Sequence, residues 1–93
     1  MAIEVRIPTI LRTYTGGASE VSAEGATLAE VLDALDADHP GIKARVLDDN
    51  GALRRFVNVY VNDEDVRFSG GLGAPISDGD VVVVLPAVAG GAR

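Results

Sequence analysis

The chain has 93 residues, with eight Lys or Arg against fourteen Asp or Glu and no cysteine. This length suits one small domain. A net charge of −6 argues against nucleic acid or an anionic membrane as a partner. Without cysteine there are no disulfides, thiolate metal sites or Cys nucleophile, which suits a reducing cytoplasm. The first residues lack the apolar run of a signal peptide, and no stretch stays apolar for the ~20 residues of a membrane helix.

Two short strands are predicted near the N-terminus. Residues Ile3–Ile7 alternate apolar and charged side chains, which is the pattern of a half-buried strand, and Pro8 ends it. Thr13–Gly17 has the composition of a turn, and Glu20–Ala23 is typical of a second strand. We therefore expect the two strands to form a β-hairpin.

A helix is predicted next. In the capping box Thr27–Glu30, the Thr27 side chain accepts a hydrogen bond from an amide of the first turn, and the Glu30 carboxylate reaches back to the Thr27 amide. Four apolar residues then follow at helical spacing: Leu28, Val31, Leu32 and Leu35. Residues 38–41 (Asp-His-Pro-Gly) end the helix, and residues 42–47 are compatible with a short helical turn.

The C-terminal half predicts strands separated by loops. Arg55–Asn62 is a strand that places Val57, Val59 and Val61 on one face. Asn62–Asp65 is predicted as a turn, and Val66–Phe68 as a short return strand. The acidic run within that turn lacks the spacing of a Ca²⁺ loop, so no metal site is predicted. Ser69–Asp80 is predicted as a loop.

The last predicted strand is the continuous apolar run Val81–Leu85, ended by Pro86. Such a run is typical of a central strand covered on both faces, or of a strand that docks onto another surface. If Val82 and Val84 face the core, an apolar patch on the opposite face marks a partner site. The candidate docking residues are Phe56, Tyr60, Val81, Val83 and Leu85.

The order of elements, β-β-α-β-β-β, predicts an α+β fold. A mixed sheet with one main helix on one face is compatible with this order, and the β-grasp (ubiquitin-like) roll is such a fold. A right-handed crossover would place the strand after the helix parallel to its neighbour in the sheet. We assign residues 1–88 to this domain and residues 89–93 to a flexible C-terminal tail.

The tail contains the diglycine Gly90-Gly91 shortly after the apolar strand. Glycine lacks a Cβ, so such a tail can lie extended in a narrow channel and bring a carboxylate up to a nucleotide phosphate. The alternative is an ordinary frayed terminus.

Several stretches resemble the ubiquitin-like sulfur-carrier proteins of the ThiS/MoaD family, particularly the branch linked to cysteine synthesis. They run from near the N-terminus to the tail, and the long middle stretch is far more specific than a diglycine. The similar stretches are residues 7–12 (IPTILR), 55–71 (RFVNVYVNDEDVRFSGG), 78–80 (DGD) and 85–91 (LPAVAGG). The resemblance implies a β-grasp fold, in agreement with the strand order.

The resemblance also implies a chemistry in which the carrier itself is not an enzyme. An ATP-dependent activating enzyme, which uses Mg²⁺, adenylates the terminal glycine carboxylate, and sulfur then displaces AMP to leave a thiocarboxylate. In this chain the reacting group would belong to Gly91, with Gly90 giving access to the channel. A thiocarboxylate is a far better nucleophile than a carboxylate. The carrier would bind no cofactor and no metal of its own.

The sequence departs from the family pattern because Ala92 and Arg93 follow the diglycine. A protease removes them, or the chain is an inactive precursor, or the two residues are not native; related carriers that need trimming favour processing. The resemblance further implies a cytoplasmic protein that delivers sulfur to a PLP-dependent cysteine synthase or another thiolating synthase.

Two other functions stay open. A covalent protein modifier would use the same activation but end as an isopeptide of Gly91 on target lysines; Lys43 is the sole lysine, so lysine-linked chains would have one site. A plain interaction domain would make the diglycine incidental, and Gly91 would then be replaceable by Ala.

Overall fold

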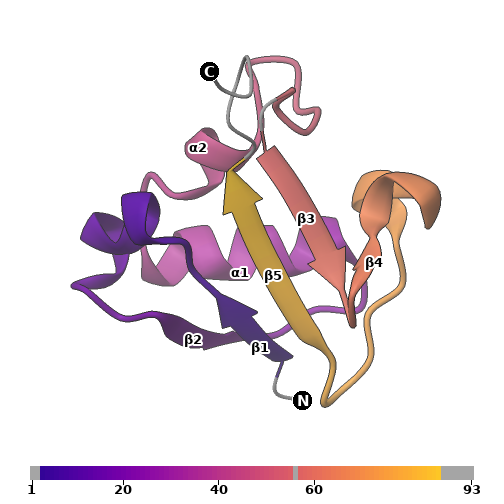
Figure 1. The fold of residues 1–93 in the computed structure, drawn as a ribbon, viewed down its shortest axis with the longest axis horizontal. Helices are drawn as coiled ribbons and strands as arrows, with labels where there is room; N and C mark the ends of the chain where they lie inside the picture. The colour runs from indigo at the N-terminus through magenta and orange to yellow at the C-terminus, as the bar shows by residue number, and fades with distance from the viewer. Residues whose placement is uncertain (1–2, 56, 87–93) are drawn as a thin grey trace.

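The computed structural model describes residues 3–55 and 57–86 (Figure 1). Its strands are β1 (Ile3–Arg6), β2 (Glu20–Ala23), β3 (Val57–Val61), β4 (Glu64–Asp65) and β5 (Val81–Pro86). Its helices are α1 (Leu28–Asp38) and α2 (Lys43–Val46), with the 3₁₀ helices η1 (Thr9–Thr15), η2 (Val66–Phe68) and η3 (Gly71–Gly73). The strands form one sheet in the order β2-β1-β5-β3-β4, and α1 crosses one face of it (Figure 1).

The last strand, β5, lies at the centre of the sheet. It pairs parallel with β1 and antiparallel with β3, while β2 and β4 lie at the edges. The expectation that the strand after the helix is parallel to a sheet neighbour is wrong, because β3 is antiparallel to both β4 and β5. The helix does connect two parallel strands, β2 and β3, but β1 and β5 lie between them.

The core lies between α1 and the sheet face that it covers. The four apolar helix positions Leu28, Val31, Leu32 and Leu35 are at most 1% exposed, as their spacing predicts. Opposite them the sheet contributes its own buried side chains: Ile3, Val5, Val59, Val82 and Val84. Each such Leu, Ile or Val contributes about 1.5–3 kcal/mol by leaving water.

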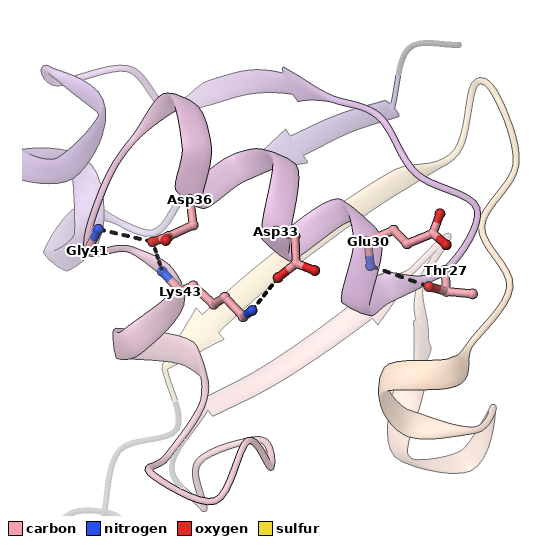
Figure 2. Close-up of polar contacts among 6 residues, drawn as sticks. All are labelled: Thr27, Glu30, Asp33, Asp36, Gly41 and Lys43. Atoms are coloured by element: carbon pink, nitrogen blue, oxygen red, sulfur yellow. Dashed lines mark hydrogen bonds and ion pairs between the residues drawn. The ribbon is translucent and has the colours of Figure 1, made fainter.

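Side chains near both ends of α1 accept hydrogen bonds from backbone amides (Figure 2). The Glu30 amide donates to Thr27 Oγ1 at 3.3 Å, as predicted, but the Glu30 carboxylate accepts from the Ala26 amide at 2.8 Å rather than from that of Thr27. The side chain therefore caps one residue further back than the expected box. Beyond the helix, Asp36 Oδ1 accepts from the amides of Gly41 and Lys43 at 3.0 and 3.2 Å.

The two N-terminal strands pair antiparallel, as predicted. Their connection is longer than a tight turn, because η1 occupies Thr9–Thr15. Gly16, with a φ of 68°, then ends η1 and donates its amide to the Arg12 carbonyl. This left-handed conformation favours glycine.

The predicted return strand at Val66–Phe68 is wrong. The chain reverses over Asn62 and Asp63, both with positive φ, so β4 begins at once with Glu64 and pairs with Val61. The Asp65 carboxylate then accepts from the Arg67 amide at 2.9 Å, and this cap starts η2 where a strand was expected.

Candidate functional site

The face of the sheet opposite α1 carries the candidate docking residues, and we call it the open face. Because Val82 and Val84 of β5 point into the core, strand alternation directs Val81, Val83 and Leu85 to the open face. Val83 lies opposite Arg6 of β1 and Tyr60 of β3 in the register. The open face thus brings together residues from three adjacent strands.

The apolar strip of β5 is accessible on this face. Val81 and Val83 are half-buried, and Leu85 is 45% exposed. Tyr60, which packs beside Val83, is also half-buried. Val82 and Val84 face the core, which is the case considered for the docking residues, although the continuous apolar run fits either parity. The alternative of a strand covered on both faces does not hold among the residues that the structure describes. Phe56 lies outside those residues, so its place on this face stays a prediction.

A charged strip borders the apolar strip on the side of β1 and β2. Arg6 Nε lies 2.8 Å from Glu4 Oε2 and 3.7 Å from Glu20 Oε2. The hydrogen bond from Arg6 lowers the pKa of Glu4 below its ordinary value. All three side chains are at least 40% exposed, so their attraction adds little stability but gives this border of the open face a fixed charge pattern.

An arginine forms several hydrogen bonds at the opposite border of the open face, where β3 begins. Arg67 of η2 donates from Nη1 to Asn58 Oδ1 at 2.9 Å, and from Nη2 to the carbonyls of Arg54 and Val57 at 3.0 and 2.7 Å. Asn58 faces Leu85 across the β3–β5 pair. Arg67 therefore holds η2 against the start of β3, the strand that pairs with the end of β5.

The other end of β5 is anchored by Asp80. Its carboxylate accepts from the Ser77 amide at 2.8 Å and from Asn62 Nδ2 at 2.9 Å, and Asn62 Oδ1 accepts in turn from the Val81 amide at 3.0 Å. The hydrogen bond from Ser77, followed by that from Asn62, lowers the pKa of Asp80 from its ordinary value of 3.8. These bonds explain the predicted loop closure at residues 77–80.

The predicted reaction site lies beyond β5. Gly90, Gly91, Ala92 and Arg93 fall outside the described residues, as does the division at residue 88. Covalent geometry alone sets a limit: Gly91 is the fifth residue after Pro86, the last residue of β5, so its Cα can lie at most about 17 Å from that of Pro86. Any enzyme that binds Gly91 must therefore come within about 17 Å of the end of β5.

Two exposed apolar side chains were missed by reasoning from the sequence. Ile10 of η1 is 66% exposed, and Phe68 of η2 is 85% exposed. Ile10 and Leu85 line one groove between η1 and the end of β5, so Ile10 extends the apolar strip. Both residues sit in 3₁₀ turns, where neither strand nor helix periodicity predicts which side chains point outward.

Within the described ranges, no three His, Asp or Glu side chains gather as a metal site. In the same ranges, no helix is both long enough and apolar enough to span a bilayer.

Known proteins resemble this chain over most of its length. The sulfur carrier protein CysO of Mycobacterium tuberculosis is 59% identical over 98% of this chain and 100% of the relative. A chain in the crystal structure of the Amycolatopsis orientalis BexX/CysO complex superposes with a TM-score of 0.91 at 59% identity, covering 95% of this chain and 98% of that one. Small archaeal modifier protein 3 of Haloferax volcanii is 34% identical over 98% of this chain and 100% of its own length.

These relatives are named as carriers or modifiers rather than as enzymes, in agreement with the expectation that the chain is not itself an enzyme. The fold is the predicted β-grasp. The model of the ThiS family matches residues 5–91, so that the match ends on Gly91. The chain therefore belongs to the ThiS family.

Proposed function

We propose that this chain is a sulfur-carrier protein that acts through a thiocarboxylate on Gly91. The observation that supports this most directly is the 59% identity to the sulfur carrier CysO across 98% of the chain. It is reinforced by the family match, which ends on the second glycine of the diglycine. The fold contributes a rigid body, an accessible apolar strip and a short tether to the reacting group.

The proposed sequence begins with hydrolysis of the Gly91–Ala92 peptide bond by a protease. A Gly91 carboxylate oxygen then attacks the α-phosphorus of ATP on an activating enzyme that uses Mg²⁺, and pyrophosphate leaves. Hydrosulfide, or a donor equivalent to it, attacks the acyl carbon, and AMP leaves. The carboxylate needs this activation because its oxygen is otherwise a poor leaving group. The carrier contributes the tail and the docking surface, while the catalytic groups belong to the partner.

The thiocarboxylate would then donate its sulfur to an enzyme of biosynthesis. A PLP-dependent cysteine synthase, or another thiolating synthase, is the class of acceptor that we propose. The complex of a CysO with BexX shows that a relative of this chain does bind a partner protein. We propose that the open face, with Val83, Leu85 and Tyr60 at its centre, is the surface through which this chain does so, in the cytoplasm.

A Gly91→Ala variant tests the proposed reaction site. The variant chain and the wild type are each prepared with residue 91 as the last residue, and ATP–pyrophosphate exchange is measured with the host's adenylating enzyme. We expect exchange with the wild type and its loss in the variant, because an added Cβ meets the wall of a channel shaped for glycine. Unchanged melting temperatures would show that the fold is intact. Equal exchange by both chains would contradict the requirement for glycine at the reaction site, and no exchange with either chain would support the plain interaction domain.

A covalent modifier is the second candidate, and the 34% identity to Small archaeal modifier protein 3 is the observation that favours it. Both functions need the same adenylate, so they separate at the next step. A carrier accumulates as a free thiocarboxylate, whereas a modifier forms isopeptides and appears in cell extracts as adducts of higher mass. The sole lysine, Lys43, forms an ion pair with Asp33 (Figure 2). A modifier that builds polymers through its own lysine would therefore have to use an amine that is already paired with a carboxylate.

A further inference from the structure

The positive charge of this acidic chain is gathered in one segment. Residues 43–55 contain four of the eight basic residues and only two of the fourteen acidic ones. The other eighty residues carry four basic and twelve acidic residues. We call Lys43, Arg45, Arg54 and Arg55 the basic end. A segment with a net charge of +2 in a chain of −6 gives the molecule a strongly uneven field.

The basic end lies where the chain leaves the sheet for the diglycine. In Figure 1, α2 and the loop that follows it lie beside the tip of β5 and the start of β3. Val57, the first residue of β3, pairs with Pro86, the last residue of β5. Its amide donates to the Arg54 carbonyl at 3.1 Å. Arg54 and Arg55 thus lie three and two residues before the residue that pairs with the end of β5.

Hydrogen bonds hold the basic end in a fixed shape. The Arg54 amide donates to the Val46 carbonyl at 2.9 Å, and Arg54 Nε donates to the Ala44 carbonyl at 3.1 Å. Asp48, one of the two acids of this segment, turns its carboxylate to the amides of Asn50 and Ala52 at 2.9 and 3.1 Å. That carboxylate is engaged within its own loop.

Arg45 is the member of the basic end whose side chain is most available to a partner protein. It is exposed on α2, and its side chain makes no hydrogen bond or ion pair that would be lost on substitution within the described part of the chain. Lys43, by contrast, is paired with Asp33 (Figure 2). Arg45 therefore presents a full positive charge to whatever approaches this end of the molecule.

We infer that the basic end docks against an acidic rim around the channel by which the activating enzyme receives the tail. The inference rests on the proposed function. A tail that lies extended in a channel puts Gly91 at the far end and Pro86 at the mouth, at most about 17 Å apart. The surface around Pro86 must then face the rim, and in this protein that surface is basic. With the tail fully extended, a nucleotide at Gly91 lies about 17 Å from Pro86, a distance over which salt screens the charge of the arginines.

An acidic rim also selects the orientation in which the two proteins meet. The remaining surface of the chain is rich in carboxylates, so an acidic rim repels it and attracts the basic end. Interactions of this kind act chiefly on the rate of association and weaken as salt is added. The tail is thereby presented to the channel before any short-range contact forms.

Charge reversal at Arg45 tests this inference. With the chain ending at Gly91, kcat/KM of the carrier in ATP–pyrophosphate exchange with the host's adenylating enzyme is measured at several salt concentrations. We expect Arg45→Glu to lower kcat/KM about three- to tenfold at low salt, with kcat unchanged, and the difference to shrink as salt rises. The melting temperature of the variant monitors the fold.

A matched control separates the basic end from net charge. The double variant Ala26→Glu with Ser77→Glu changes the net charge by the same two units at exposed positions near the start of α1 and before β5, and should leave kcat/KM within about twofold. Equal values for Arg45→Glu and the wild type, or an equal fall in the control, would overturn the inference. No exchange with the wild type itself would instead refute the proposed function on which the inference rests.

Discussion

Adjacent residues of β5 should respond oppositely to truncation, because they point to opposite faces of the sheet. Val84 is 2% exposed and faces α1, whereas Leu85 is 45% exposed on the open face. Val84→Ala removes two buried carbon groups at about 0.8 kcal/mol each. The cavity left in the core adds to this, for a total of about 2–3 kcal/mol. For a domain of this size, that corresponds to a fall of about 10–20 °C in melting temperature.

Leu85→Ala removes one carbon more than Val84→Ala but should lower the unfolding free energy less. Nearly half of this residue is already in water, so only about half of the transfer term is lost, and no closed cavity forms. We expect about 1 kcal/mol. Urea denaturation of the two variants measures the difference, and the slope of unfolding free energy against urea should stay unchanged. A loss from Leu85→Ala equal to or above that from Val84→Ala would refute the assignment of the open face.

Three further predictions concern the elements that position this face. Thr27→Ala should lower the unfolding free energy by about 1 kcal/mol, because the Glu30 amide loses its cap, and chemical denaturation would measure it; no change would refute the role of the cap. Gly25→Ala should destabilise the fold by more than about 1 kcal/mol, because an added Cβ would lie 2.7 Å from the Val31 amide nitrogen; a variant as stable as the wild type in thermal melts would contradict this. Asp80 has a lowered pKa, so its contribution to stability is present above pH about 4 and is lost as the pH falls through the folded value; Asp80→Asn should be less stable at pH 7, with a deficit that shrinks in acid, and a constant deficit would argue against the carboxylate.

The parts of the fold with a single dominant signal could be predicted from the sequence. Apolar spacing identified α1, and a continuous apolar run identified β5 as a strand. Both signals depend on burial alone, which does not require knowledge of the neighbours. The run fits either parity, so which of its side chains face the core depends on the register of β5 with β1 and β3. The β-grasp topology followed from the order of elements, whereas the place of β5 between β1 and β3 depends on contacts between residues far apart in the chain.

Two of the predictions that failed depend on single hydrogen bonds. The Glu30 carboxylate accepts from the amide of Ala26 rather than from that of Thr27. The sequence pattern of a capping box does not distinguish between these two neighbouring amides. The stretch Val66–Phe68 has the composition of a strand, but the Asp65 carboxylate binds the Arg67 amide and starts a 3₁₀ turn. Local side-chain to backbone bonds of this kind compete with strand formation.

The candidate site was predicted in part. Tyr60, Val81, Val83 and Leu85 do share one accessible face, as the parity of their strands required. Ile10 was missed because it joins that face from a 3₁₀ turn in another part of the chain. The position of the basic end beside the tip of β5 could not be predicted from the sequence either, because it arises from the pairing of Val57 with Pro86.

The central claim is that Gly91 carries sulfur, and the intact mass of the protein from its native cytoplasm tests it most directly. We predict a chain that has lost Ala92 and Arg93 and has gained the mass difference between one sulfur and one oxygen atom, most abundantly when an acceptor for the sulfur is lacking. Loss of the dipeptide without sulfur, together with adducts on other proteins, would support the modifier instead. A chain that keeps both residues and bears no sulfur, even during sulfur starvation, would contradict the account.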